Sequence, residues 1–507
     1  MSELGDVYRA KRSELLERGV QPYPHAFDRT HHAAQILGWG ERVTEQDGER
    51  VAVAGRVVAK RGHGKAGFAH LLDESGRIQW YARADVLPEA EYALFHDVTL
   101  GDWVGVVGPV FRTRTGEITV RAERLRLLCK ALRPFPDSWH GLRDVETRYR
   151  QRYADLFMNP EVREVFRRRT GIVTGLRRFL DARGYLEVET PVLQPLYGGA
   201  FARPFTTHHH ALDTTLYLRI SNELYLKRLL VGGFERVYEF AKDFRNEGID
   251  RAHNPEFTQL EVYEAFVDYE YMMRLTETMI AEVAEVVTGS TRVPYQDQVL
   301  ELRPPWRRIS LLESVGEATG EDVSDLDPGR LSRLCRHHGL EARPGAGAGG
   351  ALDELFSALV QPQLVQPTLV LDHPREISPL AKVNRRNPKL VERFEPFIAG
   401  MEIGNAFSEQ NDPVEQEAAF EAQMRQREAG DAEAQVLDRD FLRALEYGMP
   451  PAGGLGLGVD RLTMVLTDSR SIRDVILFPQ LRPEERGGDG EPAPGAETEL
   501  DGASPPK

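Results

Sequence analysis

Residues 51–128 alternate between apolar and polar positions in short runs such as VAVAGRVVA and RIQWYAR. Successive side chains on a strand point to opposite faces, so this period of two predicts half-buried strands. The turn sequences DESGR and RTRTGE separate some of the runs as hairpins. Five short strands in one region predict a small closed or partly open barrel. The pattern alone fits an oligonucleotide-binding barrel and a generic small barrel equally well.

Other segments have the periodicity of helices. Residues 3–19 predict a helix that ends at QPYP, and residues 269–287 predict another. The longest such segment, 160–185, is predicted to end at Gly184. The apolar residues on one side of this helix are Val162, Val165, Phe166, Ile172, Leu176, Phe179 and Leu180.

The strands expected after residue 185 are mixed with these helices. LEVETPVL (186–193) predicts a strand that carries Pro191, and RVYEFAKDFRNE and TQLEVYEAFVDY predict two strands around a loop. The run 453–468 predicts a glycine-rich strand that enters a helix, and PGAGAGG (344–350) predicts a flexible loop. Strands and helices together indicate an α+β fold.

These patterns divide the chain into three parts. Residues 1–140 are expected to form the N-terminal helix and barrel, and residues 141–486 a larger mixed domain. Residues 487–507 contain five acids and one lysine among Gly, Pro and Ala. That composition predicts a disordered acidic tail.

Composition adds limits on the class of protein. The 507 residues are 41% hydrophobic and 28% charged, which is ordinary for a globular protein, and no apolar run is long enough for a membrane span. The charged N-terminus lacks the apolar core of a signal peptide. Because the chain has only two cysteines, neither a disulfide framework nor a cysteine metal site is expected. The sequence therefore predicts a cytoplasmic protein without membrane partners.

Charge is distributed unevenly. The whole chain has a formal net charge of -15, which argues against a surface that is basic throughout. Residues 51–130 depart from this balance, with 12 Lys and Arg against 9 Asp and Glu. The barrel is therefore the best place to expect a phosphate-bearing partner.

The glycine-rich run GGLGLGVDRL lacks both the GxGxxG and the GxxxxGK[ST] spacing. Small residues on a strand allow a flat ligand to approach the backbone, and Arg461 after it suits a base or a phosphate. A tightly packed strand–helix corner fits the same residues.

The stretch FRNEGIDRAHNPEFTQLE (244–261) mixes charges at uneven intervals. Arg245 and Glu247 are expected on one face of a strand, and Phe257 begins the return strand. Such a hairpin places Arg245 and His253 on phosphates and Phe257 under a base. An exposed hairpin with surface ion pairs is the alternative.

A third stretch, FEPFIAGMEIGNAFSEQND (394–412), alternates Asn405, Phe407 and Glu409 on one strand face. Glu395 and Glu402 supply the oxygen ligands that Mg²⁺ prefers beside phosphates. Several acids on one sheet face imply that a cation lies opposite them, because unpaired buried charge is unfavourable.

These stretches, with the long helix before them, resemble class II aminoacyl-tRNA synthetases. The helix 160–185 and the Pro191 strand resemble signature motif 1, residues 244–261 resemble motif 2, and the glycine-rich strand with Arg461 resembles motif 3. Over residues 5–485 the chain is similar to the bacterial lysyl-tRNA synthetase family. The segments that carry the resemblance include GRVVAKRGHGKAGFAHL, FLDARGYLEVETPVL, LYLRISNELYLKRLLVGGFERVYE, FRNEGIDRAHNPEFTQLEVYEAF, FSEQNDP and GLGLGVDRLTMVLTDSRSIRDVILFP. The resemblance implies an oligonucleotide-binding (OB) fold that binds the anticodon, a class II catalytic domain with an antiparallel sheet flanked by helices, and a homodimer formed through motif 1. The implied substrates are ATP, L-lysine and tRNA(Lys), with Mg²⁺ as cofactor.

The resemblance also implies roles for the residues that bind ATP. Arg245 contacts both the lysine carboxylate and the α-phosphate, and Arg461 covers the face of adenine opposite Phe257. Glu247 reads the adenine amino group, and His253 contacts the outer phosphates. Glu395 and Glu402 hold Mg²⁺.

The implied lysine pocket is acidic. Glu223, Glu261 and the backbone of Gly199 face the α-amino group, and Glu409 and Tyr263 face the ε-ammonium. Asn405 contacts the carboxylate and Phe407 lines the alkyl chain. None of these positions is basic, whereas a pocket for aspartate needs a basic group.

In the barrel, the family positions that stack on and read the anticodon bases fall on Phe68 and Gln79, with Arg61 nearby and Glu117 as a weaker match. Unstacked bases suit such stacking and edge recognition. Two residues depart from the family pattern. Met401 replaces a basic residue and Ala406 a glycine, and both substitutions predict altered affinity.

Two other functions remain open to the sequence. A lysyl transferase acting on a protein resembles the catalytic domain only, and the barrel argues against it. A non-catalytic nucleic-acid-binding relative would have lost site residues that this chain keeps. The run His208-His209-His210 is not expected to bind a metal, because adjacent strand residues face opposite ways.

Overall fold

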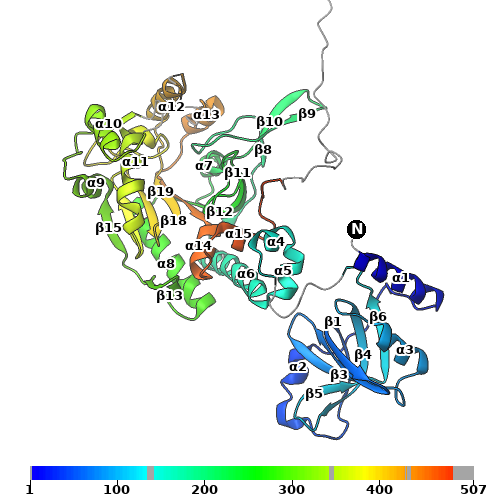
Figure 1. The fold of residues 1–507 in the computed structure, drawn as a ribbon. Helices are drawn as coiled ribbons and strands as arrows, with labels where there is room; N and C mark the ends of the chain where they lie inside the picture. Colours follow the sequence, from blue (N-terminus) through cyan, green and yellow to red (C-terminus); the bar gives the residue numbers. More distant parts are fainter. Residues whose placement is uncertain (1–2, 134–141, 342–346, 429, 431–434, 484–507) are drawn as a thin grey trace, which may run out of the picture. The chain divides into compact units, whose positions relative to one another are not determined.

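The computed structural model describes residues 3–133, 142–341, 347–428, 430 and 435–483 (Figure 1). It divides into two compact units, Met1–Arg143 and Asp144–Lys507. The acidic tail 487–507 and part of the segment that joins the units lie outside the described residues. Within the described residues, no helix combines the length and the apolar character that crossing a bilayer requires.

The first unit is a barrel with short helices around it. Its elements are α1 (Glu3–Glu17), α2 (Ala33–Leu37), β1 (Arg50–His63), β2 (Ala66–Leu72), β3 (Arg77–Arg83), α3 (Glu89–Asp97), β4 (Trp103–Arg112), β5 (Ile118–Arg121) and β6 (Arg124–Cys129). The predicted N-terminal helix and the alternating strands are confirmed. The run ITVRAERLRLL is interrupted after Arg121 and forms the two strands β5 and β6.

Five strands close the barrel. The hydrogen-bonded order is β1-β2-β3-β5-β4, and β4 pairs back with β1. Val53, Leu71, Trp80, Val106 and Val120 fill the interior from these five strands. Because side chains alternate, the neighbouring positions of each strand point outward and remain available for a ligand.

The second unit has helices around a large sheet. Its helices are α4 (Val145–Arg150), α5 (Arg152–Met158), α6 (Pro160–Asp181), α7 (Glu223–Val231), α8 (Tyr269–Thr288), α9 (Leu311–Thr319), α10 (Pro328–His337), α11 (Gly347–Leu359), α12 (Pro413–Glu428), α13 (Arg439–Glu446), α14 (Val459–Leu466) and α15 (Ile472–Val475). Its strands are β7 (Leu186–Glu187), β8 (Leu193–Gln194), β9 (Thr206–His209), β10 (Thr214–Leu218), β11 (Arg236–Phe244), β12 (Glu256–Ala265), β13 (Arg292–Tyr295), β14 (Gln298–Glu301), β15 (Arg307–Ser310), β16 (Thr368–Leu371), β17 (Arg393–Ile398), β18 (Met401–Glu402), β19 (Gly404–Ser408) and β20 (Ala452–Gly458).

The large sheet has the order β15-β16-β17-β19-β20-β12-β11-β7, with β18 added beside β17. All neighbours are antiparallel except the pairs β15–β16 and β11–β7. Helices α6 and α8 pack on one face, where Leu176 and Ile280 contact a core that includes Leu260, Leu455 and Ala406. The opposite face is left for polar side chains. This is the mixed α+β architecture that the sequence predicts.

Three local expectations are wrong. LEVETPVL does not form one strand: only Leu186–Glu187 and Leu193–Gln194 are paired, and Pro191, which lacks an amide proton, lies between them. The second half of PGAGAGG begins helix α11 at Gly347. Strand β11 ends at Phe244, so Arg245 and Glu247 belong to the loop that follows it and not to the strand.

Candidate functional site

Three neighbouring strands present polar side chains on the sheet face away from α6 and α8. Strand β20 lies between β12 and β19, so that Gly456 pairs with both Glu261 and Asn405. Two residues along, Gly454 pairs in the same way with Tyr263 and Phe407. The period of two thus carries all four side chains to one face, as the sequence predicts for each strand separately.

The glycines of β20 make room for these side chains. A Cβ atom added at Gly456 would lie 2.5 Å from Nε2 of Gln259 and 2.7 Å from Oε1 of Glu261. One added at Gly454 would lie 2.6 Å from the ring of Tyr263. The run GGLGLG is therefore the floor of a polar site and not a dinucleotide loop.

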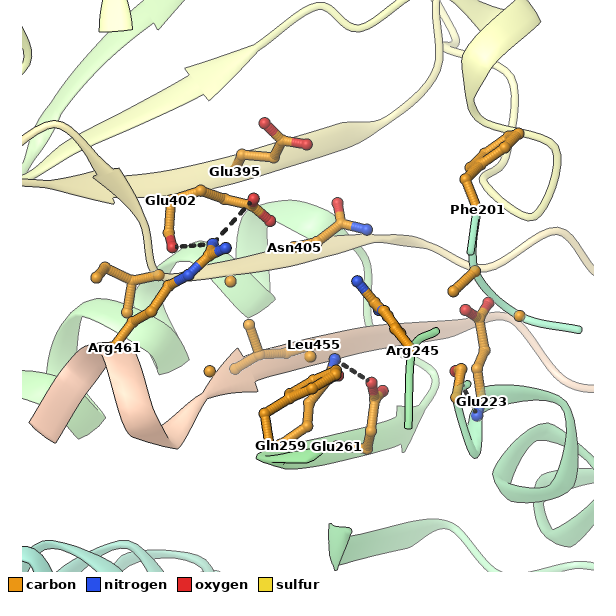
Figure 2. Close-up of a pocket in the computed structure, with 18 of the residues that line it drawn as sticks. Phe201, Glu223, Arg245, Gln259, Glu261, Glu395, Glu402, Asn405, Leu455 and Arg461 are labelled. Atoms are coloured by element: carbon orange, nitrogen blue, oxygen red, sulfur yellow. Dashed lines mark hydrogen bonds and ion pairs between the residues drawn. The ribbon is translucent and has the colours of Figure 1, made fainter. Parts of the chain in front are cut away.

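A cavity of about 530 Å³ opens above this floor (Figure 2). It brings together almost all of the residues predicted for ATP, lysine and Mg²⁺. Those that line it are Gly199, Glu223, Arg245, Glu247, His253, Phe257, Glu261, Tyr263, Glu395, Glu402, Asn405, Phe407 and Arg461. Glu409 is the exception.

Arg245 occupies the middle of the cavity. In Figure 2 its side chain points into the space between Glu395 and Glu402 on one side and Glu223 and Glu261 on the other. Its guanidinium carbon lies 5.0 Å from the centre of the Phe257 ring, and its Nε atom is buried without a hydrogen-bond partner among the described residues. A cation with an unmet donor in a cavity is suited to an anionic ligand.

Arg461 belongs to the first turn of α14 and reaches across the cavity. Its Nη1 donates to the backbone oxygen of Glu402 at 2.7 Å and lies 3.2 Å from the Glu402 carboxylate. Its Nη2 lies 3.1 Å from Nε2 of His253, whose Nδ1 is 2.8 Å from Asp250. The hydrogen-bond network implies that Nδ1 carries the proton and Nε2 accepts from Arg461. Two residues from different motifs thus meet at one end of the cavity.

Glu395 and Glu402 lie at the same end, on the antiparallel strands β17 and β18. One Glu395 oxygen is 2.5 Å from Arg393, and burial raises the pKa of Glu395 to about 8, with Glu402 adding to the rise and Arg393 opposing it. A divalent cation offsets such unfavourable burial. No group of three or more Asp, Glu, His or Cys side chains arranged to hold a metal occurs in the described part of the chain. The two carboxylates supply oxygen ligands of the kind that Mg²⁺ prefers and would hold such an ion between them.

The opposite end of the cavity holds buried acids. Oε2 of Glu261 accepts a hydrogen bond from the Tyr263 hydroxyl at 2.9 Å, and Oε1 accepts one from Gln259 at 2.6 Å. Burial raises the pKa of Glu261 well above its ordinary value, and the charges of Glu223 and other nearby acids add to the rise. Burial likewise raises the pKa of Glu223. A cationic ligand would offset the unfavourable burial of both carboxylates.

Glu409 lies beside the cavity floor, where its Oε1 would overlap a Cβ atom added at Gly454, a residue that lines the cavity. Glu409 itself lies just beyond the end of β19, is buried, and is outside the cavity lining. Its carboxylate contacts the ammonium of Lys227, a buried residue of α7 that also lies 2.6 Å from Glu223. Lys227 is not among the residues that the sequence indicates for this site. Its spacing of four residues from Glu223 on a helix was the available signal.

Arg393 was also missed. Its Nε donates to Oδ1 of Asn405 at 2.8 Å, and its Nη1 donates to Ser378 at 2.8 Å. Holding the oxygen of Asn405 leaves the Nδ2 amide as a donor toward the cavity, which suits a carboxylate. Of the two departures from the family pattern, Ala406 faces the helix core and not the cavity, and Met401 packs at the edge of the same core.

In the barrel, the predicted residues gather on one outer face. The Phe68 ring stacks on Tyr81 at 4.4 Å between centres, and Arg61 lies 5.6 Å from the Phe68 ring. Gln79 is almost fully buried, and its amide group contacts Arg61 at 3.3 Å and Thr119 at 2.8 Å.

The aromatic row continues beyond these residues. Tyr81 lies 6.3 Å from Phe111, and Arg121 lies 4.8 Å from the Phe111 ring. Aromatic rings flanked by arginines form a surface on which bases stack. At the edge of this face, Glu117 lies 2.8 Å from Nε2 of His70. Tyr81, Phe111 and Arg121 were missed, although the alternation of their strands places them on this face.

The histidine run lies on an exposed hairpin of the second unit. His208 and His209 belong to β9 and are exposed, and His208 lies 3.4 Å from Asp213. None of the three is part of a metal-binding group among the residues that the structure describes.

Comparison with known proteins agrees with both units. Residues 144–482 match the family described as tRNA synthetases class II (D, K and N), and residues 51–128 match the OB-fold nucleic acid binding domain. Lysine–tRNA ligase of Moorella thermoacetica is 55% identical over 485 residues, which cover 96% of this chain and 99% of that protein. The enzyme of the same name from Bacillus subtilis is 49% identical over 488 residues, which cover 95% of this chain and 98% of that protein.

The burial of Glu395 predicts a pH-dependent instability. Its pKa in the folded protein is about 8 against an ordinary value of 4.5, so the folded protein holds a proton that the unfolded chain releases. Stability therefore falls as the pH rises from about 4.5 to about 8. Glu395→Gln should raise the unfolding temperature at pH 8 without divalent cations, and the gain should vanish below about pH 4.5. The change in unfolding temperature is measured by thermal unfolding across this pH range, with the exposed Glu417→Gln as the control variant. The same pH slope in Glu395→Gln and the wild type would contradict the assignment.

Proposed function

The chain belongs to the class II tRNA synthetases, among relatives that are lysine–tRNA ligases, and we propose that its cavity joins L-lysine to tRNA(Lys) in two steps. In the first, lysine and ATP form lysyl-adenylate and pyrophosphate. In the second, lysine passes to the 3′-terminal adenosine of the tRNA. The observation that carries this proposal is the position of Arg245 between two sets of acids, one suited to Mg²⁺ and one suited to ammonium groups.

Lysine occupies the end of the cavity that holds the buried acids. Glu223 and Glu261, with the backbone of Gly199, hold its α-ammonium, and the Nδ2 amide of Asn405 donates to its carboxylate. Tyr263 and Glu409 are assigned to the ε-ammonium and Phe407 to the alkyl chain. Their burial strengthens these contacts, because water does not screen them.

ATP occupies the end with Arg461. Phe257 stacks on adenine and Glu247 accepts from its amino group, while His253 contacts the outer phosphates. Arg461 now forms hydrogen bonds with Glu402 and His253, and these contacts must break before ATP binds. Glu395 and Glu402 hold Mg²⁺, which offsets the negative charge of the phosphates when it is bound.

The chemical step brings two anions together. An oxygen of the lysine carboxylate attacks the α-phosphorus, the bond to the bridging oxygen breaks, and pyrophosphate leaves. Arg245 contacts both anions, so its charge offsets their repulsion and the charge that develops in the transition state. No protein nucleophile is required, and orientation and electrostatics provide the catalysis. In the second step a ribose hydroxyl of the tRNA attacks the lysyl carbonyl and AMP leaves.

The barrel binds the anticodon of tRNA(Lys). Phe68 stacks on one base and Tyr81 and Phe111 extend the surface, while Arg61 contacts the backbone phosphates. Gln79 and Glu117 read base edges, for which Gln79 must exchange one of its present contacts. The excess of basic residues in this region supports the assignment.

We also propose that the protein works as a homodimer in the cytoplasm, where ATP and tRNA are found. Support for a dimer comes from apolar side chains that lie exposed after motif-1 helix α6, namely Leu186, Val192 and Leu193. Exposed large apolar side chains within one short stretch are typical of an interaction surface.

The purified chain should catalyse pyrophosphate exchange into ATP with lysine and not with the other standard amino acids. The acidic pocket leaves an unpaired charge with any ligand that lacks the second ammonium group. Exchange is measured with labelled pyrophosphate across all twenty amino acids. Exchange with aspartate or asparagine and none with lysine would refute the pocket assignment.

Arg245→Ala should reduce lysine-dependent exchange by at least ~10²-fold, because the transition state loses its central cation. The unfolding temperature should stay close to the wild-type value, since the guanidinium is not part of the core. Lys242→Ala, an exposed residue of the preceding strand, is the matched control and should keep its activity. Unaltered exchange in Arg245→Ala would remove its assigned role.

Phe68→Ala should impair tRNA charging and leave pyrophosphate exchange unchanged, because exchange does not use the anticodon. Loss of one stacked base contact corresponds to ~1–3 kcal/mol, or roughly tenfold in kcat/KM for tRNA. Trp103→Ala, a partly exposed aromatic of the same barrel, is the control. Equal charging by both variants would argue against this face as the anticodon site.

A further inference from the structure

Lys227 is a charged side chain with no exposed surface. Its ammonium lies 2.6 Å from Oε1 of Glu223, contacts Oε2 of Glu409, and lies 3.4 Å from the backbone oxygen of Leu380. Its side chain is 0% exposed, as is that of Glu409. Such a cation is held in one position by its partners, because an unpaired buried charge is strongly unfavourable.

The position of Lys227 is directly behind the lysine end of the cavity. Glu223 and Phe407 line the cavity and Lys227 does not, yet its ammonium is 5.3 Å from the centre of the Phe407 ring. A second ring, Phe441 of α13, lies 6.0 Å away. The two rings and the two carboxylates leave the ammonium no path to solvent, so it cannot itself bind a substrate carboxylate.

Other ionisable groups approach this cluster from the neighbouring elements. They are Glu261 and Tyr263 on β12, Arg393 on β17, and Asp438 and Asp440 at the start of α13. The two aspartates bind Arg228 at 2.9 and 3.2 Å rather than Lys227. Arg393 bonds Glu395 and Asn405. The acids that depend on Lys227 are therefore Glu223 and Glu409.

The pKa values in the cluster follow from burial and charge. Burial by itself would lower the pKa of Lys227, but Glu223 and Glu409 outweigh it and raise the pKa above its ordinary value. Burial raises the pKa of Glu409 to about 8, and Lys227 opposes this rise. Lys227 thus keeps its charge and opposes the rise in the pKa of both carboxylates.

We propose that Lys227 is a positioning and specificity-determining residue, which supplies the third cation of a pocket that has three buried carboxylates and takes an amino acid with two ammonium groups. Glu223, Glu261 and Glu409 need three positive charges when ionised. The α- and ε-ammonium groups of lysine supply two, and Lys227 supplies the one that is always present. This inference rests on the proposed function and concerns how the same pocket recognises lysine.

The internal cation explains how an acidic pocket can be built before the substrate arrives. Without it, Glu223 and Glu409 would lie buried close together and would tend to hold a proton, and a protonated carboxyl does not attract an ammonium group. With it, the rise in the pKa of both carboxylates is opposed, and both are held in place by the ammonium. The substrate then meets charges that are already oriented.

The test is Lys227→Met, which keeps most of the side-chain volume and removes the charge. The KM for lysine should rise at least about tenfold, since its carboxylate partners lose their counter-ion. The KM for ATP and kcat should change little, because Lys227 does not touch the reacting atoms. The acid limb of kcat/KM for lysine should move to higher pH by about one unit or more, because the carboxylates lose the charge that lowers their pKa.

Two further variants complete the measurement. Lys227→Arg keeps the charge, so its pH profile should remain that of the wild type even where the changed shape raises the KM. Lys382→Met removes a nearby half-buried lysine that bonds the neutral Asn411, and it should leave the lysine KM and the pH profile unchanged. If Lys227→Met does not fold, as judged by its thermal unfolding, the pH profile of Lys227→Arg decides the question.

The outcomes separate the two proposals. A wild-type chain without lysine-dependent exchange would refute the proposed function. Wild-type exchange with an unshifted pH profile and unchanged lysine KM in folded Lys227→Met would refute the role of Lys227 alone, as would a shifted profile in Lys227→Arg. A lower unfolding temperature together with unchanged lysine KM would leave Lys227 as a structural ion-pair residue and overturn the inference.

Discussion

Strand β20 is the element on which the site depends, because its glycines leave the middle of the cavity floor without side chains. Glu261 and Tyr263 approach from β12, and Asn405 and Phe407 from β19. A methyl group at Gly454 or Gly456 would occupy the space that these side chains fill. The antiparallel register then fixes which residues face each other, and the core under the sheet fixes which face is buried.

The second organising feature is the pairing of buried charge. Acids line both ends of the cavity, and burial raises the pKa of Glu395, Glu261 and Glu223. A protein tolerates such groups when a cation is supplied by the chain or by a ligand. Arg393 and Lys227 supply part of that charge from within the fold. The negative charge that these two residues do not offset is unfavourable, and lysine and the magnesium complex of ATP would offset it.

The surfaces of the two units suit different ligands. In the barrel the apolar interior determines which positions face outward, so Phe68 and Tyr81, which are half-buried, and Phe111, which is buried, form one row of rings. In the larger unit, helices α6 and α8 cover one sheet face, so the polar face is left for small charged ligands. Flat rings suit bases, and an acidic cavity suits a ligand with two ammonium groups.

Much of this protein was determined by local pattern. Alternation predicted the barrel, the helical period predicted α6 and α8, and the resemblance to the synthetase family indicated the cavity residues from Gly199 to Arg461. What the sequence could not decide was set by contacts between distant segments. Arg245 lies in a loop because β11 ends at Phe244, and the Glu409 carboxylate meets the ammonium of Lys227, which lies 182 positions earlier in the chain. The periodicity of a sequence predicts the face of a helix or strand on which a side chain lies. Only the packing of the folded chain decides which buried charges meet, because that pairing depends on distance in space and not on separation along the chain.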